Sequence, residues 1–203
     1  MQLCTLYLFA FRLAYARGRL SEAETRRLTA ELLRAGEVIQ PRLADCEQIK
    51  YLASRFVNTQ SCFFIGRGFD YALSLEGSLK LKEISYLHAE AYPAGEMKHG
   101  PIALIDEGFP VIAVATKSPV YDKLVSNLQE AKARGAMVVA IATEGDEDIR
   151  HHADHVIYIP KVRDAFSAIT ASVPLQLFAR AIAVERGCDV DQPRNLAKSV
   201  TVE

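Results

Sequence analysis

The chain has 203 residues, of which 50% are hydrophobic, and a formal net charge of -1 at pH 7. A chain of this size can bury one good core. Lys and Arg are spread along the sequence, so no basic surface for nucleic acid is predicted, and small polar or anionic metabolites are the expected ligands. The four cysteines lie far apart without metal-ligand spacing, which predicts reduced thiols in a cytoplasmic protein, and neither a disulfide framework nor a zinc site.

The N-terminal segment, 1–57, is predicted to be helical throughout. Residues 2–16 form a predicted helix that is apolar on nearly every side. Such helices are normally buried all round, so this one is expected to pack against a partner. The continuous apolar run from Leu3 to Phe11 is about half a membrane span and is closed by Arg12, so neither a signal peptide nor a transmembrane helix is predicted. Ser21 and Glu24 form a capping box for a second helix that runs to about Ile39. A third helix is predicted from about Arg42 to Val57.

Short apolar runs alternate with helices from Ser61 onward. Four runs are rich in β-branched residues and continuously hydrophobic, as strands buried on both faces are: 61–66, 110–116, 137–142 and 155–160. A short strand is expected at 88–92. Helices are predicted at 71–87, 119–134, 146–153 and 164–186, followed by a polar tail from Gly187. This rhythm predicts an α/β fold, a doubly wound parallel sheet with right-handed crossovers and helices on both faces.

The predicted helix 71–87 carries three charges on one narrow stripe, at Glu76, Lys80 and Glu83. At about 100° per residue, Leu79 and Tyr86 are expected on one side of this stripe, Ile84 on the other side and Leu87 within it. We interpret the pattern as charges held in a walled site, where desolvation of one carboxylate tunes its proton affinity for proton transfer. The alternative is a surface helix with two incidental ion pairs.

A second candidate feature is the glycine-rich turn at 66–68, Gly66-Arg67-Gly68, which follows a strand and precedes a helix. Such a turn is half of a dinucleotide fingerprint, but Tyr71 occupies the place of the third glycine. A tight turn that needs positive φ explains the glycines equally well.

The glycines and proline of residues 94–101 predict a loop, and its His99 lies on no apolar face and is a candidate acid or base near neutral pH. Near the end of the chain, Pro193 is predicted to open a helix that places Arg194 and Lys198 on one side. A lysine shielded from water beside an arginine is a nucleophile toward carbonyl carbon. The alternative for this tail is a frayed terminus.

Two other clusters are not expected to bind metal. His151, His152 and His155 with Asp154 straddle a helix end and a strand start, so they would point in different directions. The acidic run 144–148 lacks the spaced ligands of a calcium loop and is expected to be a solvated loop and helix cap.

Two long segments carry a resemblance to a known family. LEGSLKLKEISYLHAEAYPAGEMKHGPIALI (75–105) and DVDQPRNLAKSVTVE (189–203) closely resemble the C-terminal isomerase half of the glucosamine-6-phosphate synthases, the glutamine:fructose-6-phosphate aminotransferases. The resemblance covers residues 58–203 as the second sugar-isomerase (SIS) domain of that family, with residues 1–57 similar to the end of the first SIS domain and the connector. It implies a three-layer sandwich with a five-stranded parallel sheet in flavodoxin-like order.

The resemblance also implies roles for the candidate residues. Glu83 matches the glutamate that moves a proton between C1 and C2 of the sugar, and His99 matches the histidine that assists ring opening in the neighbouring subunit of a homodimer. Lys198 matches the lysine that forms a Schiff base with the open-chain carbonyl. Glu76, Lys80 and Arg194 match supporting charges. No cofactor is implied.

The implied reaction makes glucosamine 6-phosphate from fructose 6-phosphate and glutamine-derived ammonia. Nothing in this sequence matches the family's glutaminase domain or most of its first SIS domain with the phosphate-binding loop. Ser167, Thr170 and Ser172 sit within a helical pattern and are not expected to replace that loop. We therefore expect a part of the longer enzyme, weakly active by itself. The alternatives are a phosphosugar-binding SIS module without chemistry and a nucleotide-binding protein.

Overall fold

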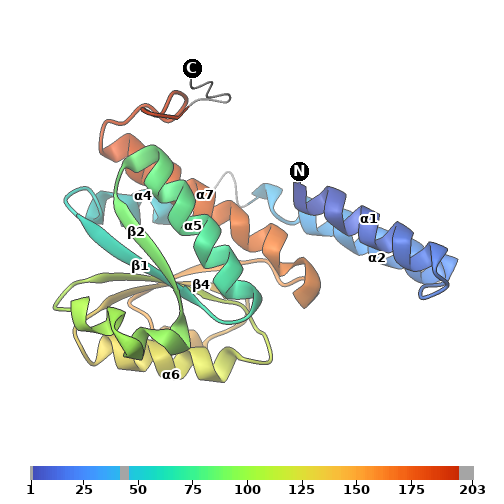
Figure 1. The fold of residues 1–203 in the computed structure, drawn as a ribbon, viewed down its shortest axis with the longest axis horizontal. Coiled ribbons are helices and arrows are strands. Elements are labelled where there is room, and N and C mark those ends of the chain that lie inside the picture. The colour runs from blue at the N-terminus through green and yellow to red at the C-terminus, as the bar shows by residue number, and fades with distance from the viewer. Residues whose placement is uncertain (1, 42–45, 197–203) are drawn as a thin grey trace, which may run out of the picture.

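The computed structural model describes residues 2–41 and 46–196, which form an α/β sandwich with a projecting helical hairpin (Figure 1). The helices are α1 (Gln2–Ala16), α2 (Glu22–Glu37), α4 (Glu47–Arg55), α5 (Phe69–Ser85), α6 (Tyr121–Lys132) and α7 (Ser167–Glu185). The strands are β1 (Ser61–Gly66), β2 (His88–Pro93), β3 (Pro110–Ala115), β4 (Met137–Thr143) and β5 (His155–Ile159). Short 3-10 helices are η1 (Ala94–His99), η2 (Pro101–Leu104), η3 (Asp148–His151) and η4 (Asp164–Phe166).

The five strands form one parallel sheet in the order β2-β1-β3-β4-β5. This order confirms the predicted flavodoxin-like arrangement, including the short strand expected at residues 88–92. Helices α4, α5 and α7 cover one face of the sheet, while α6 and η1 cover the other (Figure 1). The predicted three-layer sandwich is therefore confirmed.

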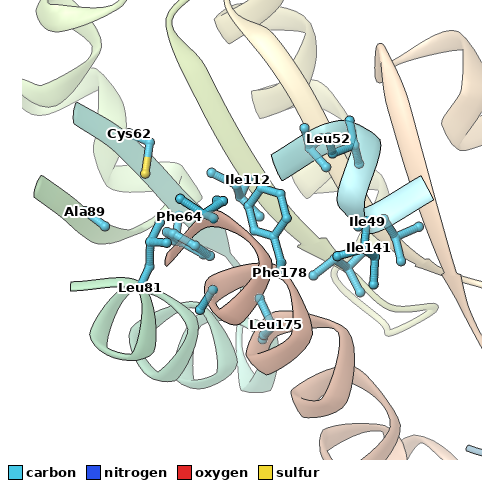
Figure 2. Close-up of a cluster of buried hydrophobic side chains, with 14 of the residues drawn as sticks. Ile49, Leu52, Cys62, Phe64, Leu81, Ala89, Ile112, Ile141, Leu175 and Phe178 are labelled. Carbon is cyan, nitrogen blue, oxygen red and sulfur yellow. The ribbon is translucent and has the colours of Figure 1, made fainter. Parts of the chain in front are cut away.

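The core is divided between the two faces of the sheet because successive strand residues point to opposite sides. On β1, Cys62 and Phe64 enter the cluster beneath α4, α5 and α7, whereas Phe63 and Ile65 enter the cluster beneath α6. Figure 2 shows the first cluster, with Phe178 of α7 between the sheet and α4. Both faces of the central strands are buried, which explains why their sequences are continuously hydrophobic.

Close packing of α5 in this layer requires a glycine. A Cβ on Gly77 would lie 2.7 Å from Cδ2 of Leu175 and 2.9 Å from the ring of Phe64. The absence of a side chain therefore lets α5 approach both β1 and α7.

The last helix is apolar because it belongs to the core. Within the described residues, Asp164–Glu185 is long and apolar enough to cross a membrane by length and composition. Buried core helices pass the same test, and Leu175, Phe178 and Ile182 are at most 1% exposed inside this domain. We therefore assign α7 to the core of the sandwich.

The N-terminal hairpin departs from its prediction. The capping box of Ser21 and Glu24 is present at the start of α2, as predicted. The all-round burial predicted for α1 is wrong, since none of its residues is buried and its apolar side chains remain exposed on several sides. Among the described residues, α1 packs against α2 and, through Tyr7 and Phe11, against Phe166.

A bidentate ion pair also joins the hairpin to the sandwich. Arg163, just before η4, donates to both carboxylate oxygens of Glu31 on α2, at 2.5 and 2.9 Å.

Several predicted boundaries change for local reasons. The loop expected at 94–101 is two short 3-10 helices, since Pro93 and Pro101 open each turn and the tighter 3-10 repeat suits such short pieces. The helix expected at 146–153 shrinks to η3. The third helix is described from Glu47, and the predicted start at 42–45 lies outside the described residues.

Candidate active site

The three charges of the α5 stripe lie together near the end of the helix. The ammonium of Lys80 donates to Glu83 Oε2 at 2.6 Å and lies 4.0 Å from Glu76 Oε1. The nearby Glu83 carboxylate raises the pKa of Lys80, so this amine stays protonated and acts as a fixed positive charge. The predicted grouping of three charges on one face is therefore observed.

The walled site predicted around these charges is only partly formed. The side chains of Glu76, Lys80 and Glu83 are 42%, 32% and 29% exposed, so the stripe is half-buried. Leu79 is 44% exposed and forms no wall. Leu87 does not lie on the stripe, because α5 ends before it and Leu87 turns into the core.

Tyr86 ends α5 in a way that the sequence pattern missed. It adopts the left-handed conformation with φ 58°, and its N–H donates to the carbonyl of Lys82 at 3.2 Å. A non-glycine residue in this region is uncommon, so the composition gave no signal for the helix end. The tyrosine ring is thereby placed at the same end of the helix as Glu83.

The C-terminal tail returns to this ring. The N–H of Arg194 donates to the Tyr86 hydroxyl at 2.8 Å, and the guanidinium lies 4.0 Å from the ring centroid. Asp189 accepts two backbone hydrogen bonds in a preceding turn and so turns the chain back. The tail as far as Leu196 is therefore a folded segment packed on the end of α5, in place of the frayed terminus considered as an alternative.

The helix predicted to begin at Pro193 is wrong within the described residues. Arg194 and Asn195 form a turn, and Asn195 has φ 62°. A right-handed helix requires negative φ, so it does not continue through Asn195. Lys198, the predicted nucleophile, lies outside the described residues. The structure therefore brings Arg194 to Tyr86, at the end of α5, by a route other than the predicted helix.

His99 lies in a different layer of the molecule. It ends η1, on the face of the sheet covered by α6, and its side chain is 75% exposed with Nε2 3.8 Å from Glu96 Oε2. One copy of the chain places Glu76, Lys80 and Glu83 together on α5 and Arg194 on the ring of Tyr86 at the end of that helix, but it leaves His99 in the opposite layer.

The glycine-rich turn between β1 and α5 is explained by packing. A Cβ on Gly66 would collide with the backbone of Asp70, and Gly68 has φ +58°. Arg67 turns away to Asn127, with its Nε donating to Oδ1 at 3.0 Å. An acidic residue, Asp70, occupies the first turn of α5, where a dinucleotide would place its pyrophosphate. These observations favour the tight turn over the nucleotide site.

Two carboxylates are buried at the carboxyl ends of the strands. Asp70 is 2% exposed and accepts hydrogen bonds from the N–H and hydroxyl of Thr116, but burial prevails and raises its pKa to about 7. Asp146 is 3% exposed and lies 3.0 Å from the ammonium of Lys117. The solvated loop predicted for 144–148 is therefore wrong at Asp146, because an ion pair allows its burial.

The histidines near β5 do not assemble a metal site. The Asp154 carboxylate already forms an ion pair with the ammonium of Lys132 at 2.6 Å and accepts a hydrogen bond from the N–H of Val138 at 2.8 Å. Over residues 2–41 and 46–196, no three His, Cys, Asp or Glu side chains are arranged to hold a metal ion.

A cavity of about 140 Å³ lies beside Ile49, Ile157 and Leu177, and none of the predicted site residues lines it.

The parallel sheet in this order, with helices on both faces, is the fold expected of a sugar-isomerase (SIS) type of domain. The family model described as SIS domain matches residues 56–186, and the chain belongs to that family.

Comparison with individual proteins narrows this class. The chain is 50% identical over 202 residues to the isomerizing glutamine–fructose-6-phosphate aminotransferase of Caldanaerobacter subterraneus and 51% identical over 201 residues to that of Thermus thermophilus. These alignments cover 100% and 99% of this chain, which spans 33% of the length of each relative. The solved C-terminal domain of glucosamine-fructose-6-phosphate aminotransferase from Francisella tularensis superposes with a TM-score of 0.82 at 34% identity, over 91% of this chain and 52% of that one.

Proposed function

We propose that this chain is the isomerase part of an enzyme that converts fructose 6-phosphate and glutamine-derived ammonia into glucosamine 6-phosphate. The observation that carries the proposal is the identity of 50% to the isomerizing aminotransferase over 100% of the chain. The grouped charges of α5 and the tail folded onto Tyr86 support it, since they bring two distant segments to one end of the same helix.

The chemistry assigned to the residues follows from their groups. Lys198 adds its neutral amine to C2 of the open-chain ketose and expels water to form an imine, from which ammonia displaces the lysine amine. Glu83 removes a proton from C1 and returns one to C2, which leaves the aldehyde at C1 and the amine on C2. Lys80 holds the Glu83 carboxylate in place, while Glu76 and Arg194 supply the surrounding charges.

The proposal includes partners for this chain. His99 assists ring opening in the site of a second copy, in a homodimer, because one copy keeps it in the other layer of the sandwich. A glutaminase domain supplies the ammonia, and a first SIS domain supplies the loop that binds the sugar phosphate. The enzyme works in the cytoplasm. Residues 58–203 act as the second SIS domain, and residues 1–57 belong to the end of the first and its connector.

Proton transfer in D2O tests the proposal. The protein expressed from its complete reading frame is incubated with fructose 6-phosphate in D2O, and deuterium in the sugar is measured at C1 and C2. We expect incorporation with the wild type, a loss of at least about 100-fold in Glu83→Gln, as for removal of a general base, and a similar loss in Lys198→Ala. Lys82→Gln, which changes a neighbouring charge on α5, is the matched control and should retain activity.

The alternative of a binding module has a distinct outcome. A phosphosugar-binding SIS module would bind fructose 6-phosphate in calorimetry without incorporating deuterium, and Lys198→Ala would leave that binding unchanged. Equal incorporation in Glu83→Gln and in the wild type would disprove the role of Glu83.

A further inference from the structure

We infer that Arg67, Asn127 and Glu130 are positioning residues that hold η1 on α6 and thereby set the place of His99. This inference rests on the proposed function, in which His99 assists ring opening of the sugar. It assigns a task to a polar network that lies apart from the charges of α5.

The network joins three separate segments of the chain. Arg67, in the turn after β1, donates from Nε to Asn127 Oδ1 on α6 at 3.0 Å. Asn127 donates from Nδ2 to Glu130 Oε2 at 3.3 Å, one turn further along α6. Glu130 Oε1 in turn lies 2.6 Å from the ammonium of Lys98 on η1. The residue next to Lys98 is His99.

The same network contacts the start of η1 as well as its end. A Cβ on Gly95 would lie 2.6 Å from Nη2 of Arg67, so the guanidinium lies close to the backbone of η1 at this glycine. Gly95 thus lies against Arg67 of the turn after β1, and Lys98 is paired with Glu130 of α6. Between these two points Met97 is fully buried in the core cluster beneath α6.

Burial and charge make this network more than a surface ion pair. Asn127 is 4% exposed, so its amide is desolvated and both of its hydrogen bonds are needed. The Lys98 ammonium holds the pKa of Glu130 below its usual range, so Glu130 stays ionised at neutral pH. The Lys98 side chain is 56% exposed, and exposed pairs are worth little, but Glu130 is only 28% exposed and also accepts from the buried Asn127 amide, so the pair has less freedom to separate.

The backbone of His99 is therefore held in place while its side chain stays exposed. The two residues before it are anchored, Met97 in the core and Lys98 by its pair with Glu130 on α6, and the His99 side chain is 75% exposed. A ring that must reach a sugar held by another copy needs such a support, because an error of about 1 Å in placing a catalytic group can cost about 100-fold in rate.

Ring opening can be separated from the later chemistry by the choice of substrate. Fructose 6-phosphate closes its ring through the C5 hydroxyl, so 5-deoxyfructose 6-phosphate, with O6 blocked by phosphate, stays open. Loss of ring-opening help should slow turnover of the first sugar and spare the second. A general loss of structure should slow both.

The experiment compares four variants of the protein expressed from its complete reading frame, with both sugars. His99→Ala reports on the proposed function, and we expect it to slow only the ring-forming sugar. Glu130→Gln keeps the shape but removes the charge facing Lys98, and we expect the same selective loss, by about 5- to 20-fold in kcat. Lys98→Gln removes the same contact from the other partner. Lys132→Gln, which breaks the 2.6 Å pair of α6 with Asp154, is the control and should show no selectivity.

Hydrogen exchange of the amides of residues 94–104 tests the anchoring itself, whatever the role of His99. We expect exchange at least tenfold faster in Glu130→Gln and unchanged in Lys132→Gln. The inference is overturned if exchange in Glu130→Gln matches the wild type, or if His99→Ala discriminates between the sugars and Glu130→Gln does not. If His99→Ala slows neither sugar, the role of His99 in the proposed function fails, while faster exchange in Glu130→Gln would still support the anchoring.

Discussion

The guanidinium of Arg194 lies 4.0 Å from the ring centroid of Tyr86, and the N–H of Arg194 donates to the hydroxyl of that same ring at 2.8 Å. The two residues lie far apart in the sequence, with four of the five strands between them. One aromatic side chain therefore fixes the tail at two points, and it does so at the end of the helix that carries Glu83.

Tyr86→Ala should release the tail. We expect faster tryptic cleavage after Arg194 and a lower kcat, with a loss of about 0.5–1 kcal/mol of stability from the cation–π contact. Tyr86→Phe removes only the hydroxyl and keeps the ring under the guanidinium, so it should fall between the wild type and Tyr86→Ala. Cleavage after Arg194 at the same rate in all three proteins would show that the ring does not hold the tail.

Gly77→Ala should destabilise the domain by about 1–3 kcal/mol, since the new methyl group overpacks the contact with Leu175 and Phe64. Urea denaturation measures the change. Gly36→Ala, in α2, is the matched control, because a Cβ added there meets no described atom within 4 Å other than those of its chain neighbours and its own helix backbone. Alanine favours a helix, so we expect a gain of about 0.5–1 kcal/mol in this control. A neutral Gly77→Ala would mean that α5 can move away from β1 without cost.

The buried Asp70 should make stability depend on pH. Its pKa is about 7 in the folded chain against 3.8 for an unperturbed aspartate, so the folded state binds a proton that the unfolded state has released between about pH 4 and 7. The free energy of unfolding should therefore fall as pH rises through this window, by at most about 1.4 kcal/mol per pH unit, and level off above it.

Asp70→Asn removes this titration. The unfolding free energy of the wild type minus that of Asp70→Asn should decrease from about pH 4 to 7, as measured by urea denaturation at several pH values. Parallel pH profiles for the two proteins would show that Asp70 keeps an ordinary pKa in the folded state.

The exposed apolar face of α1 should promote self-association of the chain. Leu6 is 63% exposed and Phe9 is 66% exposed. Replacing both with Glu should therefore leave the free energy of unfolding nearly unchanged, as is usual for surface substitutions, while lowering the mass measured by light scattering. Tyr7→Ala is the contrasting variant. Because Tyr7 packs on Phe166 and donates to the carbonyl of Ala165, its loss should destabilise the hairpin.

The fold could be predicted because the information is local. Continuous runs rich in β-branched residues, such as 110–115, are typical of strands covered on both faces, and their alternation with helices leaves few topologies. The stripe of Glu76, Lys80 and Glu83 was likewise visible, since it needs only the helical repeat.

The errors came from information that is not local. Whether α1 is buried depends on which surfaces surround it, and apolar composition does not provide that. The left-handed Tyr86 is stabilised by its surroundings and not by residue type, so the helix end and the position of Leu87 were misjudged. The buried Asp146 and the network of Arg67 and Asn127 likewise depend on partners from distant segments.

The placement of Glu83 and His99 in opposite layers also bears on genetics. If both act on one sugar, each reaction centre is shared between two polypeptides. A cell that makes two inactive forms of the protein, one altered at Glu83 and the other at His99, would then assemble some mixed pairs with one intact centre, and growth could be restored by combining two defects.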